Sequence, residues 1–296
     1  GVNTSSPEQL RCSLHATIKG HTAFRYSGSG TNTWTILETV QTDPADNTKI
    51  IDSYRNRSYV KGTDRAGSGG GNKYNREHTW PNSLGFPGQT DGSGNPNAPY
   101  TDTHMLHLTD EQQNSARGNR PLANCPTGGS CTELQTVANN GVGGGSGVYP
   151  GNSNWVAGGN GNVGSFEVWN HRKGDIARAI MYMAIRYEGG THPVTGQAEP
   201  NLELTDDRDD IQGGSGTSTT HYMGLLTDLL AWHQADPPTE EEVIRNDVIQ
   251  SFQGNRNPFV DHPEWGTMAL FTSSSPETCV PAESPGIFAD GFEMQD

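Results

Sequence analysis

A carboxylate and an imidazole stand side by side at Glu77 and His78, within the run Arg-Glu-His-Thr-Trp-Pro. Further along the chain come Asp102, His104 and the amide Asn114. Carboxylate and amide oxygens are hard ligands that suit Mg²⁺, which keeps several waters and leaves positions open for a phosphate. An imidazole can take a proton from water near neutral pH. These residue types predict metal-assisted hydrolysis of a phosphate ester.

The motifs resemble those of the bacterial endonuclease I family, which are periplasmic and secreted non-specific nucleases of the ββα-metal (His-Me finger) type. The motifs that carry the resemblance are 76–81, Asp102-x-His104 and Asn114-x-x-Arg117-Gly118-Asn119. Shorter matching segments extend the likeness from about residue 10 to about residue 272, at 14–15, 18–22, 173–178, 232–233, 254–259 and 261–264. Chance agreement over so much of the chain is improbable.

The resemblance implies that Glu77 and Asn114 bind the metal, which would be Mg²⁺ with Mn²⁺ or Ca²⁺ as substitutes. It implies that His78 is the general base, and that the enzyme hydrolyses phosphodiester bonds in DNA, and in RNA as well, to leave 5′-phosphate ends. Glu77 and His78 are neighbours on an expected strand, so their side chains diverge. Pro81 cannot donate to a sheet ladder, which predicts that the strand ends nearby.

Two supporting roles are assigned with alternatives left open. Asp102 or a backbone carbonyl would bond the second ring nitrogen of His78. Some family members carry a transition-state arginine between the two motifs, but positions 79–101 hold no Arg or Lys. Arg117 is then the first candidate for this role, because it lies one helical turn after Asn114. The alternative is that Arg117 only pairs with a nearby carboxylate.

The formal charge of −15, from 19 basic and 34 acidic residues, excludes a uniformly basic nucleic-acid coat. Binding a polyanion then requires a local cluster of cations, and phosphate contacts of this kind imply little sequence preference. We expect one cleft lined by the basic residues near the motifs: Lys73, Arg76, Arg120, Arg172 and Lys173, with Arg55, Arg57, Lys61 and Arg117 as further candidates.

The cysteines indicate an oxidising compartment, because their number is even. Cys125 and Cys131 bracket a short loop, and Cys12 and Cys279 lie near the two ends, so we expect one disulfide within each pair. The first residue is Gly1, as in a processed chain, and the apolar stretches are far shorter than the roughly 20 residues of a membrane span. We expect a secreted or periplasmic monomer without membrane contact.

The elements that must position these residues predict an α+β fold, a mainly helical mixed domain around a ββα-metal finger with long Gly- and Asn-rich loops. Apolar periodicity and capping residues predict helices at 110–117, 174–187, 221–234 and 239–253. Extended segments near 50–60, 75–80 and 103–108 are the expected strands. One nuclease domain would cover 1–275, with a tail at 276–296.

Two other functions are weighed against the nuclease. One is a zinc-dependent hydrolase that uses His78, His104 and His107. Against this function, the sequence lacks the H-E-x-x-H helix motif of a zinc protease. The other is a non-catalytic extracellular binding module, against which the intact set of Glu77, His78 and Asn114 speaks.

Overall fold

The computed structural model describes residues 1–67, 72–126, 129–276 and 278–280. Its helices are α1 (Pro7–Ile18), α2 (Thr33–Val40), α3 (Ala98–Thr101), α4 (Glu111–Arg117), α5 (Lys173–Arg186), α6 (Leu226–Ala235), α7 (Glu240–Gln253), α8 (Pro258–Asp261) and α9 (Met268–Thr272). Its strands are β1 (Thr42–Asp43), β2 (Asp46–Ile51), β3 (Ser58–Val60), β4 (Tyr74–His78), β5 (Leu106–Asp110), β6 (Thr132–Gln135), β7 (Ser153–Ala157), β8 (Ser165–Glu167), β9 (Asn201–Leu204) and β10 (Thr220–Met223).

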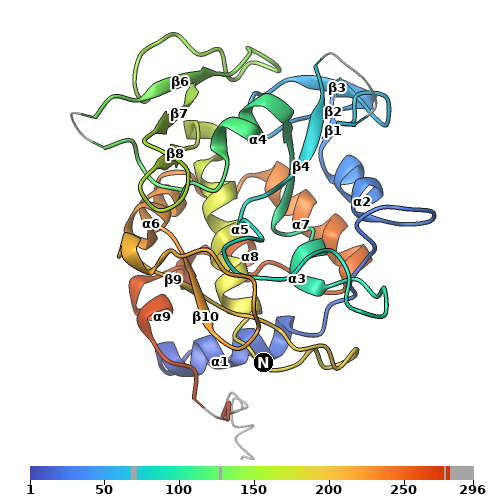
Figure 1. Ribbon diagram of the computed structural model, residues 1–296, viewed down its shortest axis with the longest axis vertical. Coiled ribbons are helices and arrows are strands. Elements are labelled where there is room, and N and C mark those ends of the chain that lie inside the picture. The colour runs from blue at the N-terminus through green and yellow to red at the C-terminus, as the bar shows by residue number, and fades with distance from the viewer. Residues whose placement is uncertain (68–71, 127–128, 277, 281–296) are drawn as a thin grey trace, which may run out of the picture.

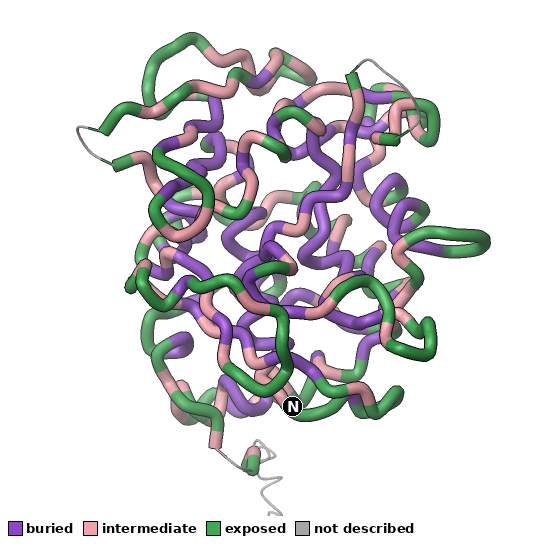
Figure 2. The backbone as a smooth tube through the Cα atoms, viewed as in Figure 1, coloured by how far each residue is buried: buried purple, intermediate pink, exposed green. Residues whose placement is uncertain are grey.

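Helix α5 forms the centre of the molecule, with α1, α6, α8 and β9 packed against it (Figure 1). All its residues from Gly174 to Arg186 are buried. Most of the backbone in the middle of the molecule is buried as well (Figure 2). Its two inward-facing arginines are neutralised by ion pairs, Arg178 with Glu242 and Arg186 with Glu199. The expected helix over 174–187 is confirmed, although it is buried on every side instead of on one face.

The strands form small separate sheets instead of one large one. The described strands pair as β1-β2-β3, β4-β5, β6-β7-β8 and the parallel pair β9-β10. This mixture of helices and small sheets confirms the α+β class. The expected helix over 221–234 starts too early, because His221 belongs to β10 and the helix α6 begins only at Leu226. Parallel pairing with β9 outweighs the helical periodicity there.

The expected helices over 239–253 and 110–117 are confirmed as α7 and α4, and residues at their ends cap them. Thr239 caps α7 by accepting a hydrogen bond from the Glu242 amide at 3.3 Å. Gly254 ends that helix with φ of 85°, a left-handed conformation that glycine adopts without strain. Asp110 caps α4 by accepting bonds from the amides of Gln112 and Gln113.

Both expected cysteine pairs are present as disulfides. Cys12 of α1 bonds Cys279, with Cα atoms 5.4 Å apart, and Cys125 bonds Cys131. The chain around Cys279 is also held to the N-terminal segment, because the Val280 amide donates to Gln9 Oε1 at 2.8 Å. Positions 281–296 of the expected tail lie outside the described residues.

Buried neutral histidines predict a protein that loses stability in mild acid. Burial lowers the pKa of these side chains below 6.5: His15, His21, His78, His104, His107 and His233. The unfolded chain protonates them below about pH 6.5, whereas the folded protein does so only at lower pH. Unfolding therefore takes up protons, and their stabilising contribution is lost as the pH falls.

A smaller set of carboxyl groups opposes this trend, because each is protonated more readily in the folded protein than in the unfolded chain. Burial raises the pKa of these groups: Asp52, Glu77, Asp236 and Glu242. We expect the free energy of unfolding, measured by urea titration, to be lower at about pH 5 than at about pH 7.5. An equal or higher value at about pH 5 would contradict the neutral burial of these imidazoles.

Candidate active site

The predicted catalytic pair lies at the end of β4. Strands β4 and β5 run antiparallel, with Tyr74 opposite Asp110 and His78 opposite Leu106. Helix α4 follows β5 at once and packs on both strands (Figure 1). It starts at the Tyr74 end and returns along the ribbon, so that Arg117 in its last turn reaches the His78 end. Strand β4 ends at His78, as Pro81 predicts, and the side chains of Glu77 and His78 make separate sets of contacts.

The imidazole of His78 has one nitrogen bonded and one available. Its Nε2 lies 2.9 Å from the carbonyl oxygen of Tyr100. A carbonyl oxygen only accepts, so Nε2 carries the proton, and Nδ1, which has no hydrogen bond to the described residues, keeps its lone pair. The Tyr26 ring stacks on the imidazole with the ring centres 5.8 Å apart, and the Tyr100 ring packs edge-on with the ring centres 4.3 Å apart. Burial lowers the pKa of His78 to about 4, so the ring is neutral at neutral pH.

Asp102 does not orient His78, which corrects its expected catalytic role. The alternative that the sequence left open, a backbone carbonyl, supplies the bond through Tyr100. The Asp102 carboxylate is fully buried and faces other partners. It accepts hydrogen bonds from the hydroxyls of Tyr182 at 2.8 Å and Tyr187 at 2.9 Å. Asp102 therefore links the segment that follows α3 to the end of α5.

The Glu77 carboxylate is almost fully buried, at 4% exposure, and one of its oxygens carries both of its hydrogen bonds within the described chain. The Tyr54 hydroxyl and Arg117 Nη1 each donate to Oε1 at 3.0 Å. Burial raises the pKa of Glu77 to about 7, while the charge of Arg117 and the two hydrogen bonds lower it. The carboxylate is therefore held by partners on one side only.

Arg117 is buried behind this carboxylate instead of facing a substrate. Its exposure is 1%, and besides Glu77 it donates to the carbonyl oxygens of His78 at 3.0 Å and Thr79 at 2.6 Å. The structure thus favours the alternative of a local ion pair over the expected transition-state arginine. Its guanidinium fixes the end of β4.

Asn114 is half-buried on α4, one helical turn before Arg117 and on the same side of the helix. No hydrogen bond of its side chain is formed with any part of the chain that the structure describes. The Asn114 amide oxygen on α4 and Glu77 Oε2 at the end of β4 are therefore oxygens without a hydrogen-bond partner among the described residues. Two hard oxygens of this kind are the ligands that Mg²⁺ prefers, with water completing the rest of its shell.

Three of the cations expected to line one cleft have partners within the protein instead. Arg76 is buried, with its guanidinium 3.4 Å from the Tyr26 ring centre and 3.9 Å from that of Trp34. Arg172 is paired with Asp175 and Glu241, and Lys173 with the buried Glu167. Each cation forms part of the packed interior, because burying a charge requires a partner there.

Arg120 and Lys73 are the other two main candidates for a phosphate contact. Arg120 is half-buried, and its partners among the described residues are neutral oxygens, those of Ala116, Arg117, Gly158 and Asn160. Its charge is therefore not compensated by these contacts. Lys73 donates to the Thr63 carbonyl at 3.1 Å and lies 4.0 Å from Asp64, at the opposite end of β4 from His78.

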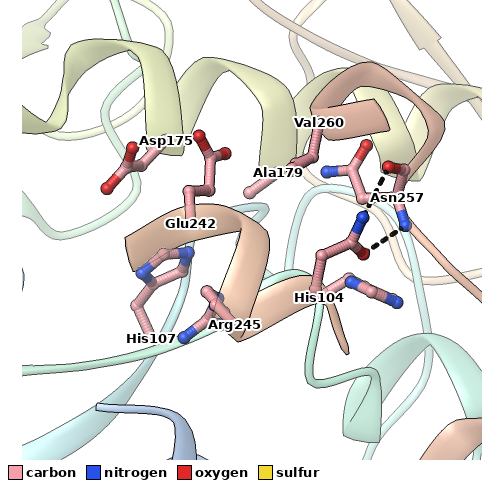
Figure 3. Close-up of a pocket in the computed structure, with 9 residues that line it drawn as sticks. His104, His107, Asp175, Ala179, Glu242, Arg245, Asn257 and Val260 are labelled. Atoms are coloured by element: carbon pink, nitrogen blue, oxygen red, sulfur yellow. Dashed lines mark hydrogen bonds between the residues drawn. The ribbon is translucent and has the colours of Figure 1, made fainter. Parts of the chain in front are cut away.

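His104 and His107 do not join His78 in a zinc site. Residues opposite one another on antiparallel strands share a face, so His107, opposite Glu77, lies on the other face of the ribbon from His78. Both histidines line a separate cavity of about 20 Å³ with Asp175, Glu242 and Arg245 (Figure 3). Across the described ranges, no group of three His, Cys, Asp or Glu side chains could hold a metal ion.

Several site residues could not be found from sequence motifs. Tyr26 and Tyr100 enclose the His78 ring, and Tyr54 bonds Glu77. Asp52 is fully buried and accepts from the amides of Tyr54 at 3.0 Å and Asp110 at 2.9 Å, so it joins the Tyr54 loop to the start of α4. Tyr26, Asp52 and Tyr54 lie in segments before the motifs, and Tyr100, although only two residues before Asp102, acts through a carbonyl group that no sequence pattern marks.

Comparison with known proteins places the chain among nucleases. A family model described as Endonuclease I matches residues 6–264. An extracellular ribonuclease of Bacillus amyloliquefaciens is 37% identical over 257 residues, covering 86% of this chain and 72% of that protein. An extracellular ribonuclease of Bacillus subtilis strain 168 is 35% identical over 266 residues, covering 90% and 75%. Within the described ranges, no helix has the length and apolarity needed to cross a bilayer.

Proposed function

Because the chain belongs to the endonuclease I family, a family of phosphodiester hydrolases, we propose that it is a secreted, Mg²⁺-dependent endonuclease without sequence preference. We assign β4, β5 and α4 as its ββα-metal finger, since the helix follows the antiparallel pair and packs on both strands. The observation that supports the proposal most is at the end of β4. There the neutral His78 has no hydrogen bond on Nδ1 within the described residues, and the preceding residue, Glu77, carries a buried carboxylate on the other face of the strand.

The proposed reaction starts at His78 Nδ1, which takes a proton from a water molecule in line with the scissile bond. The water oxygen bonds to phosphorus as the bond to the 3′ oxygen breaks, the 3′ oxygen takes up a proton from solvent water, and the phosphate remains on the 5′ end of the downstream fragment. The Tyr100 carbonyl stabilises the imidazolium through the Nε2 proton. Glu77 and Asn114 would hold Mg²⁺, which neutralises charge on the phosphoryl and leaving oxygens when bound.

The substrates of this proposal are RNA and DNA, gripped through phosphates. The names of the two relatives support RNA, and the motifs that resemble the DNA-cutting nucleases support DNA. Arg172 and Lys173 are held in ion pairs and Arg76 lies over two aromatic rings, so Arg120 next to α4 is our first proposal for a phosphate contact. A bound metal ion would then contribute much of the attraction between the protein and the nucleic acid. The two disulfides support export to an oxidising compartment.

The purified protein tests this directly. Plasmid DNA, single-stranded DNA and single-stranded RNA are each incubated with protein treated with EDTA, and then with Mg²⁺ or Zn²⁺ added back. We expect cleavage inside the strand with Mg²⁺ and not with Zn²⁺, and 5′-phosphate ends that accept ligation without a kinase. Restoration by Zn²⁺ alone would favour the zinc hydrolase, and no cleavage of any substrate would favour the binding module.

A further inference from the structure

The two hydrogen bonds on Glu77 lead to an inference that rests on the proposed function and deepens it. We propose that Tyr54 and Arg117 are positioning residues. Together they hold Oε1 of Glu77 so that Oε2 is the oxygen presented to the divalent cation.

Both donors bond the same oxygen. The Tyr54 hydroxyl and Arg117 Nη1 lie 3.0 Å from Glu77 Oε1, and both side chains are buried. A carboxylate oxygen has two lone pairs in its plane, so these two bonds fill the capacity of Oε1. Oε2 has no hydrogen bond within the ranges that the structure describes. A rotation of the carboxylate would break both bonds, so the two donors define which oxygen stays available.

Tyr54 is itself fixed on several sides. Its amide donates to Asp52 Oδ1 at 3.0 Å, its carbonyl accepts from Asn154 Nδ2 at 2.6 Å, and its ring packs 4.9 Å from that of Phe166. Asp52 Oδ1 also accepts from the amide of Asp110, the residue that caps α4. One buried carboxylate thus sets the position of the Glu77 partner and of the helix that carries Asn114.

Arg117 alone cannot keep Glu77 in this orientation. A guanidinium can bond a carboxylate through two parallel hydrogen bonds, which would engage both oxygens. Here the second terminal nitrogen, Nη2, is occupied by the Thr79 carbonyl, and Nη1 is shared with the His78 carbonyl. Tyr54 adds the bond that holds Oε1. Without its hydroxyl, we expect the carboxylate to turn, and Oε2 to be lost to the metal for part of the time.

The test compares Tyr54→Phe with Tyr187→Phe in the full chain. Tyr187 is a matched control, because its buried hydroxyl also donates to a buried carboxylate, that of Asp102, away from Glu77. Mn²⁺ binding is measured by electron paramagnetic resonance without nucleic acid. We expect Tyr54→Phe to weaken Mn²⁺ binding about 10- to 100-fold, the usual effect of losing a partner of a metal ligand. Tyr187→Phe should bind Mn²⁺ like the wild type.

The outcomes separate this inference from the proposed function. If the wild type binds Mn²⁺ and Tyr54→Phe binds it equally tightly, the positioning role alone is overturned. Wild-type protein that binds no Mn²⁺ would overturn the metal site itself, and this inference with it. Urea unfolding checks that both variants fold. If Tyr54→Phe does not, Arg117→Lys serves instead, since lysine keeps the charge but cannot bond Glu77, His78 and Thr79 together.

Discussion

Replacing His78 by alanine should lower kcat on nucleic acid by about 10²- to 10⁴-fold, the usual contribution of a general base. Its free Nδ1 is the proposed proton acceptor, and alanine offers no basic atom at this point. The loss should appear in kcat and leave Mn²⁺ binding nearly unchanged, because the proposed metal ligands are Glu77 and Asn114. Initial rates of plasmid nicking and RNA cleavage at saturating Mg²⁺ measure the effect.

His262→Ala is the control for this change. His262 is exposed and stacks on Trp265 at 3.9 Å, so the variant also loses an imidazole next to an aromatic ring. It should cut at the wild-type rate. Cleavage by His78→Ala at that same rate would contradict the assignment of the base. A free imidazole added to the buffer should partly restore the activity of His78→Ala, if the cavity left by the side chain admits it.

The second large effect is expected for Glu77→Gln. The amide keeps the size of the side chain but removes the negative charge that attracts a divalent cation. It also leaves Arg117 buried without its counter-ion, which costs stability. We expect Mn²⁺ binding to fall below detection and cleavage to fall by about 10³-fold or more, comparable to removal of a central catalytic group. Calorimetric Mn²⁺ titration and cleavage rates measure the two effects.

Glu38→Gln is a control of the same chemistry at another place. Glu38 is buried and accepts from Arg65 and from the Tyr74 hydroxyl, as Glu77 does from Arg117 and Tyr54. Glu38→Gln should lose a similar amount of stability in urea unfolding and keep Mn²⁺ binding and cleavage. If both variants lost activity equally, the effect of Glu77→Gln would be ascribed to folding and its role as a ligand would be wrong.

The sequence predicts the local part of the site well, because that part depends on neighbouring residues. Adjacent positions on a strand must diverge, β4 ends shortly before Pro81 as expected, and Asp110 caps α4 through its side chain. The helix cap at Thr239 and the glycine at its other end follow from the same short-range chemistry. These features need no knowledge of the rest of the fold.

The partners of each charge could not be predicted, because they come from elsewhere in the chain. Arg76 packs on Tyr26 and Trp34, and Lys173 pairs with Glu167, so neither side chain is available for phosphate. In the sequence a buried arginine and a substrate-binding arginine look alike. Only the packing distinguishes them, since it decides which charges leave water and need a partner.

The same limit applies to the groups that orient the site. The carbonyl of Tyr100, instead of Asp102, bonds His78, and a backbone atom leaves no signature in the sequence. Likewise, β10 pairs with β9 across an intervening loop, so the segment at His221 is extended although its apolar spacing favours a helix. Long-range pairing outweighs local preference at such positions.

The most direct test of the central claim is a crystal structure of the protein soaked in Mn²⁺, with the ion located by anomalous scattering. We predict one ion bound by Glu77 Oε2 and the Asn114 amide oxygen, with water completing its shell and His78 Nδ1 free of it. An ion bound instead at His104 and His107, or at none of these residues, would contradict the account.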